Sequence, residues 1–184
     1  MKSLGIRVAA VLSLGLLSVL GLTQPASATE WTEWHANSPN CRWVYVQSTA
    51  SNYVVAAELG GGDRRLRART SPANADTWEL FRLRGVGYDY TLMSANELSY
   101  VSADIGGDGT LYARAAVADT WEKFHIFTYD HDGAGVDLVN IMSAANSRWV
   151  SADIGGDGTL RARATVNDRW EGFRVFFLGD TWAC

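Results

Sequence analysis

Hydrophobic and polar residues alternate with a period of two along two short segments that a glycine-rich turn separates. Val101 and Ala103 alternate with polar neighbours in the first segment, and Leu111 and Ala113 do so in the second. A period of two is typical of half-buried antiparallel strands. The pattern predicts a β-hairpin, and no helical period of useful length follows the first 28 residues.

The hairpin belongs to a unit that occurs three times. The segment "VSADIGGDGTL" stands at 101–111 and again, letter for letter, at 150–160. The 35 residues from Leu92 align without a gap with those from Ile141, and a more divergent copy begins at Val46. Each copy contains four strand-like segments. We therefore predict an all-β protein, a β-trefoil of twelve strands in three repeats of about 46–49 residues. A three-bladed propeller is disfavoured, because propellers carry about four to eight blades.

The turn of the hairpin sets the pairing of its two strands. Residues 106–108 form a three-residue loop, and Gly109 follows in the left-handed conformation. This register turns Ala103, Leu111, Val101 and Ala113 inward, and a shift of one residue would point charged groups at the core. The remaining side chains are expected to face outward in three pairs: Asp104 with Thr110, Ser102 with Tyr112, and Tyr100 with Arg114.

The N-terminal residues have the features of a secretory signal peptide. Lys2 and Arg7 precede an apolar run of about 15 residues, and Ala-Ser-Ala occupies 26–28. The run is shorter than the ~20 residues that span a membrane. We expect cleavage after residue 28 and a secreted, extracellular protein. Residues 29–41 then form an extension whose role stays open, and 42–184 form the trefoil domain, with repeats at about 42–87, 88–136 and 137–184.

The net charge limits the expected binding partners, and the cysteines predict a disulfide. Without Lys2 and Arg7, fourteen basic residues face twenty acidic ones, a net charge of −6. Nucleic acid and anionic membranes need a basic surface, so neither is expected as a partner. The only two cysteines, Cys41 and Cys184, are expected to form a disulfide in an exported chain. Such a bridge makes the first and last strands of the domain neighbours, and we expect a monomer.

The repeat has known counterparts. "YVSADIGGDGTLYARAAVADTWEKFHI" resembles the repeat of fascin-like β-trefoil domains, in which an Ala-acid strand leads to a glycine turn and a Trp-Glu-x-Phe strand. The resemblance covers three copies from about residue 42. It implies the trefoil fold, with functions that range from actin bundling to attachment to secreted glycan-processing enzymes.

A more distant resemblance is to ricin-type lectin trefoils, whose repeats end in Gln-x-Trp. Here Asp76, Asp119 and Asp168 stand in place of the glutamine, and the third strand lacks that family's aromatic platform. The resemblance therefore implies the fold, and the galactose site of that family is not carried over.

Motifs for catalysis and metal binding do not emerge from the sequence. The histidines His35, His125 and His131 lie in no known catalytic context, so an enzyme is not expected. Aspartates in the glycine-rich turns and at 130–137 do not match the spacing of a calcium loop. We interpret them as turn formers and expect neither a metal nor a cofactor.

Two sets of aromatic residues are candidates for sugar stacking. Trp78, Trp121 and Trp170 belong to the Trp-Glu-x-Phe elements, and we expect them to pack inward because the fourth strand closes the hydrophobic layer. The outward face of the repeated hairpin is the better candidate, since an aromatic ring, a carboxylate and a guanidinium together hold a neutral sugar. The predicted ligand-binding residues are Tyr100, Asp104, Tyr112, Arg114, Trp149, Asp153, Arg161 and Arg163.

Other interpretations of this face stay open. Arg114 on Tyr100 and Arg163 on Trp149 are equally consistent with internal cation–π pairs. Unit one has Val54 in place of the ring, so only two sites are expected. The sequence favours a secreted, non-catalytic, lectin-like protein that binds a glycan. The alternatives are a trefoil-type protease inhibitor, with 70–76 or 130–137 as its loop, and a fascin-like module that binds actin or another protein target.

Overall fold

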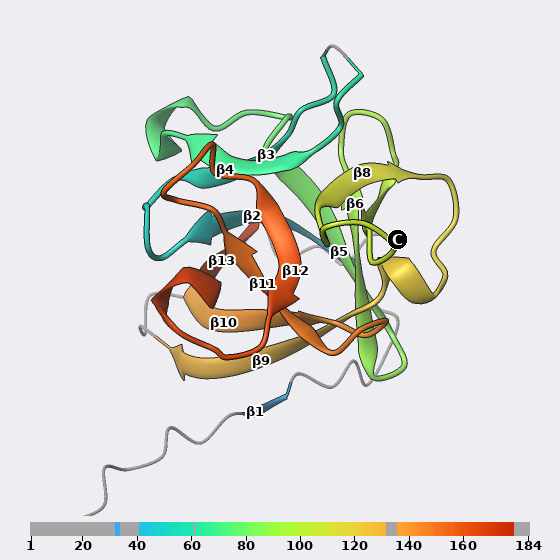
Figure 1. Ribbon diagram of the computed structural model, residues 1–184. Helices are drawn as coiled ribbons and strands as arrows, with labels where there is room; N and C mark the ends of the chain where they lie inside the picture. The colour runs from blue at the N-terminus through green and yellow to red at the C-terminus, as the bar shows by residue number, and fades with distance from the viewer. Residues whose placement is uncertain (1–31, 34–40, 61, 132–135, 179–184) are drawn as a thin grey trace, which may run out of the picture.

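The computed structural model describes residues 32–33, 41–60, 62–131 and 136–178, which form strands and three single-turn 3₁₀ helices (Figure 1). The predicted signal peptide and Cys184 lie outside the described residues. In the part of the chain that is described, no helix is long and apolar enough to cross a membrane.

Each repeat supplies four strands, as the period-two pattern predicts. Unit one contains β2 (Cys41–Ser48), β3 (Val54–Ala57), β4 (Leu66–Thr70) and β5 (Leu80–Val86). Unit two contains β6 (Asp89–Ser94), β7 (Tyr100–Ala103), β8 (Leu111–Ala115) and β9 (Phe124–His131). Unit three contains β10 (Val136–Ser143), β11 (Arg148–Ala152), β12 (Leu160–Ala164) and β13 (Gly172–Leu178). The 3₁₀ helices η1 (Pro72–Asn74), η2 (Thr120–Glu122) and η3 (Arg169–Glu171) precede the fourth strands, and a short strand β1 (Thr32–Glu33) pairs with β9. The predicted all-β trefoil of twelve strands is confirmed.

The first and fourth strands of the three units close into a barrel. The antiparallel pairs run β2–β5–β6–β9–β10–β13, and β13 returns to β2 with Leu178 opposite Trp43. The first and last strands of the trefoil are therefore neighbours, as expected. Cys41 is buried at the start of β2, and its disulfide with Cys184 remains a prediction because Cys184 is not described.

The second and third strands of each unit form a hairpin, and the three hairpins cap one end of the barrel. Each hairpin is bonded to the preceding one in the same way, through the backbone N–H of an alanine on its third strand. The three bonds are Ala68 N–H to Gly158 O (2.8 Å), Ala113 N–H to Arg64 O (2.8 Å) and Ala162 N–H to Gly109 O (2.7 Å). This closed ring of bonds gives the cap its threefold pseudosymmetry.

The repeated turn is shaped by this contact between hairpins. Gly109 and Gly158 adopt left-handed conformations, with φ of 80° and 77°. A Cβ at these positions would lie 2.8 Å from the carbonyl oxygen of Ala162 and 2.7 Å from that of Ala68. The identical glycines thus have a structural role, because the neighbouring backbone occupies the space of a side chain.

Candidate functional site

The predicted hairpin register holds in the centre and changes at one end. Val101 pairs with Ala113 and Ser102 with Tyr112, as expected. A bulge between Tyr100 and Val101 then moves Tyr100 opposite Ala115, and the same shift puts Trp149 opposite Ala164. The prediction that Tyr100 lies beside Arg114 is therefore wrong, because the extra residue in the third strand displaces the pair.

The face predicted to be outward is partly covered. Ser102, Thr110, Ser151 and Thr159 are all buried. Thr110 bridges to Arg161 and Thr159 to Arg67 of the adjacent hairpins. A single hairpin presents this face to water, but at the pseudothreefold axis it meets the next hairpin.

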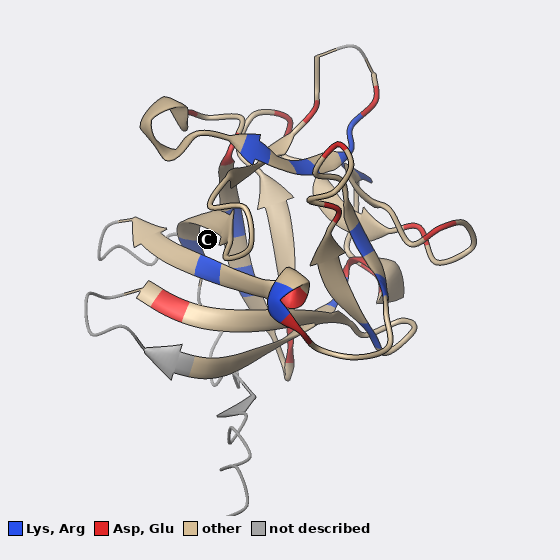
Figure 2. Ribbon diagram, turned by 60° about the vertical axis from the view of Figure 1, so that its left-hand side comes forward, with Lys and Arg blue, Asp and Glu red and all other residues tan. Residues whose placement is uncertain are grey.

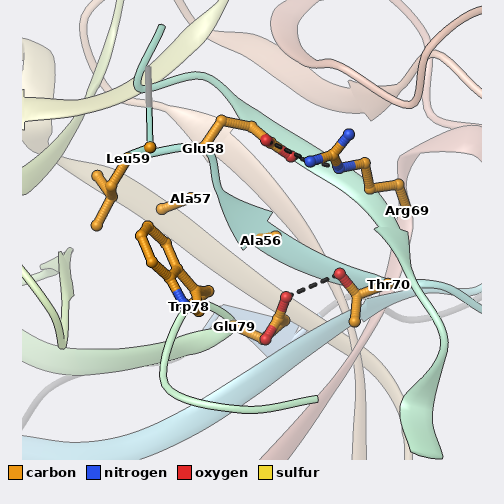
Figure 3. Close-up of a pocket in the computed structure, with 9 residues that line it drawn as sticks. Ala56, Ala57, Glu58, Leu59, Arg69, Thr70, Trp78 and Glu79 are labelled. Atoms are coloured by element: carbon orange, nitrogen blue, oxygen red, sulfur yellow. Dashed lines mark hydrogen bonds and ion pairs between the residues drawn. The ribbon is translucent and has the colours of Figure 1, made fainter. Parts of the chain in front are cut away.

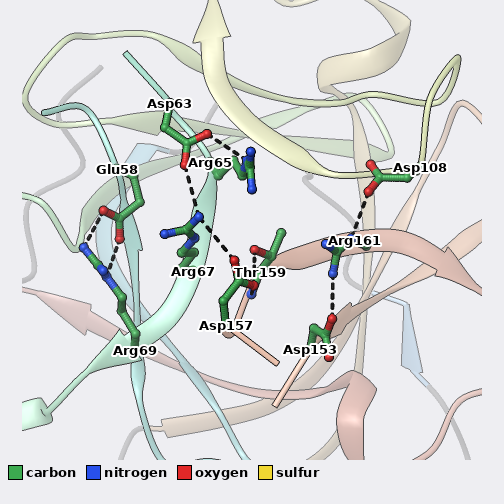
Figure 4. A network of polar contacts seen from close by, with 10 residues as sticks. All are labelled: Glu58, Asp63, Arg65, Arg67, Arg69, Asp108, Asp153, Asp157, Thr159 and Arg161. Carbon is green, nitrogen blue, oxygen red and sulfur yellow. Dashed lines mark hydrogen bonds and ion pairs between the residues drawn. The ribbon is translucent and has the colours of Figure 1, made fainter. Parts of the chain in front are cut away.

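Arginine and aspartate side chains link the three hairpins across this axis. Positively and negatively charged groups lie side by side there (Figures 2 and 4). We call them the cap network: Asp63, Arg67, Asp108, Asp153, Asp157 and Arg161. Arg161 donates to Asp153 Oδ2 (2.9 Å) on its own hairpin and to Asp108 Oδ2 (3.1 Å) on the next. Arg67 lies in the same way 3.1 Å from Asp63 Oδ2 and 3.2 Å from Asp157 Oδ2. The predicted ligand residues Asp153 and Arg161 are thus engaged with each other.

Tyr112 stands at the position that Arg67 and Arg161 occupy in the other two units. The guanidinium of Arg114 lies over the Tyr112 ring, 4.4 Å from its centroid, and 3.7 Å from Asp104 Oδ1. Trp149 contacts Phe127 edge-on, with ring centroids 5.2 Å apart. The structure therefore brings Asp104, Tyr112 and Arg114 together.

The cap network is expected to make the stability of the folded protein depend on pH in acid. Thr110 donates its hydroxyl (2.6 Å) and its N–H (3.0 Å) to Asp108 Oδ1, and with Arg161 these bonds lower the pKa of Asp108 from 3.8 to about 2. The pKa of Asp157 is lowered in the same way, mainly by the Thr159 hydroxyl. A lowered pKa in the folded state gives stability that is present above pH 3.8 and is lost as the pH falls through 2.

We expect Asp108→Asn/Asp157→Asn to flatten this acid dependence. Urea unfolding of the variant and the wild type at several pH values between about 2 and 5 measures it, because the titration window spans the folded and unfolded pKa values. Asp119→Asn, at the exposed aspartate that precedes η2, is the matched control. Equal slopes for the wild type and the double variant would contradict a role of these two carboxylates.

The tryptophans of the Trp-Glu-x-Phe elements do not pack inward, which overturns the prediction made from the sequence. Trp78, Trp121 and Trp170 are 42%, 43% and 39% exposed. Each lies in the turn before the fourth strand, where the neighbouring glutamate turns inward. The core positions are taken instead by the phenylalanines Phe81, Phe124 and Phe173.

In unit one a half-exposed tryptophan lies in one pocket with an acid and an arginine, and the sequence has corresponding residues in the other two units. The acid ends the second strand, and the arginine lies on the third strand. We call each set a trio: Glu58, Arg69 and Trp78 in unit one, Asp104, Arg114 and Trp121 in unit two, and Asp153, Arg163 and Trp170 in unit three. Sequence reasoning missed the trios because it placed the tryptophans in the core.

The trio of unit one surrounds a pocket of about 260 Å³ (Figure 3). Trp78 lies on one side, and the ion pair between Glu58 and Arg69 lies on the other. Between them Glu79 Oε1 accepts a hydrogen bond from the Thr70 hydroxyl (2.7 Å). Unit one has Val54 where the other units have Tyr100 and Trp149. In this unit Trp78 forms the aromatic wall of the pocket.

The described residues contain no group of three or more histidine, cysteine or acidic side chains placed to hold a metal ion. The acidic segment 130–137 falls partly outside the described residues. The pocket in unit one offers an indole ring, a paired carboxylate and guanidinium, a second carboxylate and one hydroxyl group.

Comparison with known proteins gives similarity of structure only. No known family matches the sequence, and no curated protein does. The designed threefold-symmetric protein ThreeFoil is similar, with a TM-score of 0.59, 9% identity, and coverage of 74% of this chain and 99% of that chain. The ricin B-like lectin of Macrolepiota procera, solved with lactose, has a TM-score of 0.54 and 14% identity, covering 72% of this chain and 93% of that chain.

A third similar structure is the Polyporus squamosus lectin bound to the epitope Neu5Acα2-6Galβ1-4GlcNAc. Its TM-score is 0.57 at 16% identity, over 76% of this chain and 49% of the lectin chain. The structural neighbours are thus β-trefoil proteins, and ricin B-like lectins are prominent among them. Identities this low show the fold alone: the chain is a β-trefoil.

Proposed function

We propose that the protein is a secreted, non-catalytic, lectin-like β-trefoil that binds a glycan in the unit-one pocket. The observation that carries the proposal is the exposed ring of Trp78 across a pocket from the Glu58–Arg69 ion pair. An indole face stacks on the apolar face of a pyranose, and a carboxylate and a guanidinium bond its hydroxyl groups.

The carboxylates of this pocket are suited to binding rather than to catalysis. Glu58 is paired with Arg69. Glu79 accepts the hydroxyl of Thr70 and the backbone N–H of Asp76 (2.8 Å). A general acid or base must be free to exchange its proton with the substrate, and both groups are engaged in holding the structure together.

The other two trios contain the corresponding residues of units two and three. Asp104, Arg114, Asp153 and Arg163, four of the residues predicted from the sequence, belong to them. Several weak sites on one rigid body favour a polymeric glycan, because a second contact forms at high effective concentration. The sugar-bound lectins among the structural neighbours support the same class of partner.

Retention on insoluble chitin, cellulose, β-1,3-glucan and xylan tests the proposal. We expect the wild type to bind at least one polymer and Trp78→Ala to bind it about tenfold or more weakly, since a stacking aromatic at a binding centre contributes roughly 2 kcal/mol. Tyr88→Ala removes another exposed aromatic, 72% exposed, and is the matched control.

Two outcomes would count against the proposal. Full retention of Trp78→Ala, together with loss in a Tyr100→Ala/Trp149→Ala variant, would move the site to the hairpin face predicted from the sequence. Failure of every polymer to retain the wild type would favour a protein target, and the loop at 70–76 would be the next surface to mutate.

A further inference from the structure

The barrel wall of unit two differs from those of the other two units. In units one and three the fourth strand pairs with a long stretch of the first strand, residues 41–45 of β2 and 136–140 of β10. In unit two the described residues contain one such pair, Tyr90 of β6 opposite Phe124 of β9. From this pair β9 continues to His131. Most of its edge on this side therefore extends past the beginning of β6.

The turn before β6 explains the difference. Val86 lies opposite Asp89, so the hairpin between β5 and β6 closes through a two-residue turn. Gly87 in this turn is left-handed, with a φ of 68°, as the tight turns of two-residue hairpins require. β6 consequently begins one residue before its pair with β9, and it does not cover the rest of that edge.

The backbone at this edge of β9 requires a partner. In antiparallel pairing the backbone groups of successive residues point to alternate sides, so one of Phe127 and Thr128 bonds to β10 and the other points to the edge. We call the N–H of the second residue the edge amide. Ile126 and Thr128 are 2% and 5% exposed, so this stretch of backbone is shielded from water. Shielded N–H and C=O groups need a hydrogen-bond partner within the protein.

The N-terminal extension supplies that partner. Glu33 of β1 lies opposite Phe127. Phe127 corresponds in sequence to Arg84 of unit one and to Phe176 of unit three. Those two residues lie opposite the first residues of β2 and β10. β1 therefore stands where the other two units have the start of their first strand.

The direction of β1 agrees with this position. β1 and β6 are both antiparallel to β9, so they run the same way along it. β1 lies opposite residues 127 and 128, and the pair between β6 and β9 follows at Phe124. The extension thus provides the beginning of a first strand that β6 lacks.

We propose that the edge of β9 beside Phe127 and Thr128 is a docking site for an extended strand, and that the N-terminal extension of the same chain occupies it. Strand addition is held by main-chain hydrogen bonds. Residues 34–40 tether the occupant to the start of β2. A short tether gives an effective concentration of about millimolar, which allows a strand of two residues to bind. The extension then completes the wall of unit two, and the proposal does not depend on the unit-one pocket.

Proline in β1 tests the proposal, because proline has no N–H and interrupts strand pairing. The dipeptide Thr-Glu occurs twice in the extension, so Thr32→Pro/Glu33→Pro has a matched control in Thr29→Pro/Glu30→Pro. Hydrogen exchange is measured by nuclear magnetic resonance on the chain from residue 29. We expect the β1 variant to raise the exchange rate of the edge amide at least tenfold. The neighbouring amide that bonds to β10, and both amides in the control, should keep the wild-type rates.

A free peptide tests the docking itself. The peptide of residues 29–40, added to the proline variant of β1, should restore slow exchange of the edge amide in a saturable way at about millimolar concentration. The same peptide with prolines at 32 and 33 should not. Dilution of the wild type should leave the edge amide protected, because the occupant belongs to the same chain.

Four results would overturn the proposal. The first is an unchanged edge amide in Thr32→Pro/Glu33→Pro, and the second is a peptide that restores nothing. The third is a loss of protection on dilution of the wild type, which would assign the occupant to a second copy of the chain. The fourth is an absence of nuclear Overhauser contacts between the backbones of Thr32 and Thr128 in the wild type, and it applies even if the variant does not fold.

Discussion

Replacing Gly109 and Gly158 together by alanine is expected to lower the free energy of unfolding by roughly 4–6 kcal/mol, because each left-handed alanine costs about 1–2 kcal/mol and each lost inter-hairpin bond about 1 kcal/mol. In the native cap, a Cβ at either site would lie within 2.8 Å of a neighbouring carbonyl oxygen. That oxygen is backbone and cannot rotate away, so the turn or the neighbouring hairpin must shift. Urea unfolding followed by fluorescence and extrapolated to water measures the loss.

Gly106 and Gly155, in the same two turns, provide the control. A Cβ at either position meets nothing within 4 Å, and neither residue is left-handed. Their double alanine variant is expected to be neutral or slightly stabilising, since alanine reduces the entropy of the unfolded chain. If the two double variants lost equal stability, the glycines would be needed for the flexibility of the turns and not for the close contact with the neighbouring hairpin.

The features that the sequence predicted correctly are local ones. The turn and the alternation around it lie within one continuous segment, so Val101 opposite Ala113 follows from the loop length alone. The order of strands follows from the threefold repeat. The register failed at Tyr100 and at its counterpart Trp149, where a bulge adds a residue that no alternation pattern reveals.

The features that could not be predicted depend on contacts between units. Thr110 looks solvent-facing within its hairpin, and only the adjacent hairpin buries it. The choice between Trp121 and Phe124 for the core depends on the direction of the η2 turn, since both residues are hydrophobic enough for either place. The hydrogen bond from the Thr49 hydroxyl to Gly172 O joins residues that are 123 positions apart.

The threefold repeat distinguishes the features that the fold requires from those that it does not. Features present in all three units, such as the cap bonds and the buried glutamates, are explained by the architecture. Features present in one unit, such as the hydrogen bond between Asn140 and Asn167, are not required by it. The trios lie between these cases, because the residues recur while the open pocket is described in unit one.

The buried glutamates of the Trp-Glu-x-Phe elements give the second large effect. Glu79, Glu122 and Glu171 each accept, through Oε2, the backbone N–H of the aspartate three residues earlier, at 2.8–2.9 Å. Each bond closes the turn that presents a tryptophan. Replacing all three glutamates by alanine leaves three donors without their acceptor, at about 1–3 kcal/mol each, so we expect a loss of roughly 6 kcal/mol.

Glutamine variants separate hydrogen bonding from charge. Burial raises the pKa of Glu171, so at this site the charged form is penalised, and the stability gained by protonation is present below the unfolded value of 4.5 and is lost as the pH rises through the folded pKa. A neutral amide keeps the acceptor without that penalty, and we expect the triple glutamine variant to retain most of the stability that the alanine variant loses. Urea unfolding compares the two, and tryptophan fluorescence in the folded state reports whether the turns stay closed. If the glutamine variant lost as much stability as the alanine variant, the carboxylate charge, and not the accepted N–H, would hold the turn. The same charge would then hold the tryptophan ring that the turn presents.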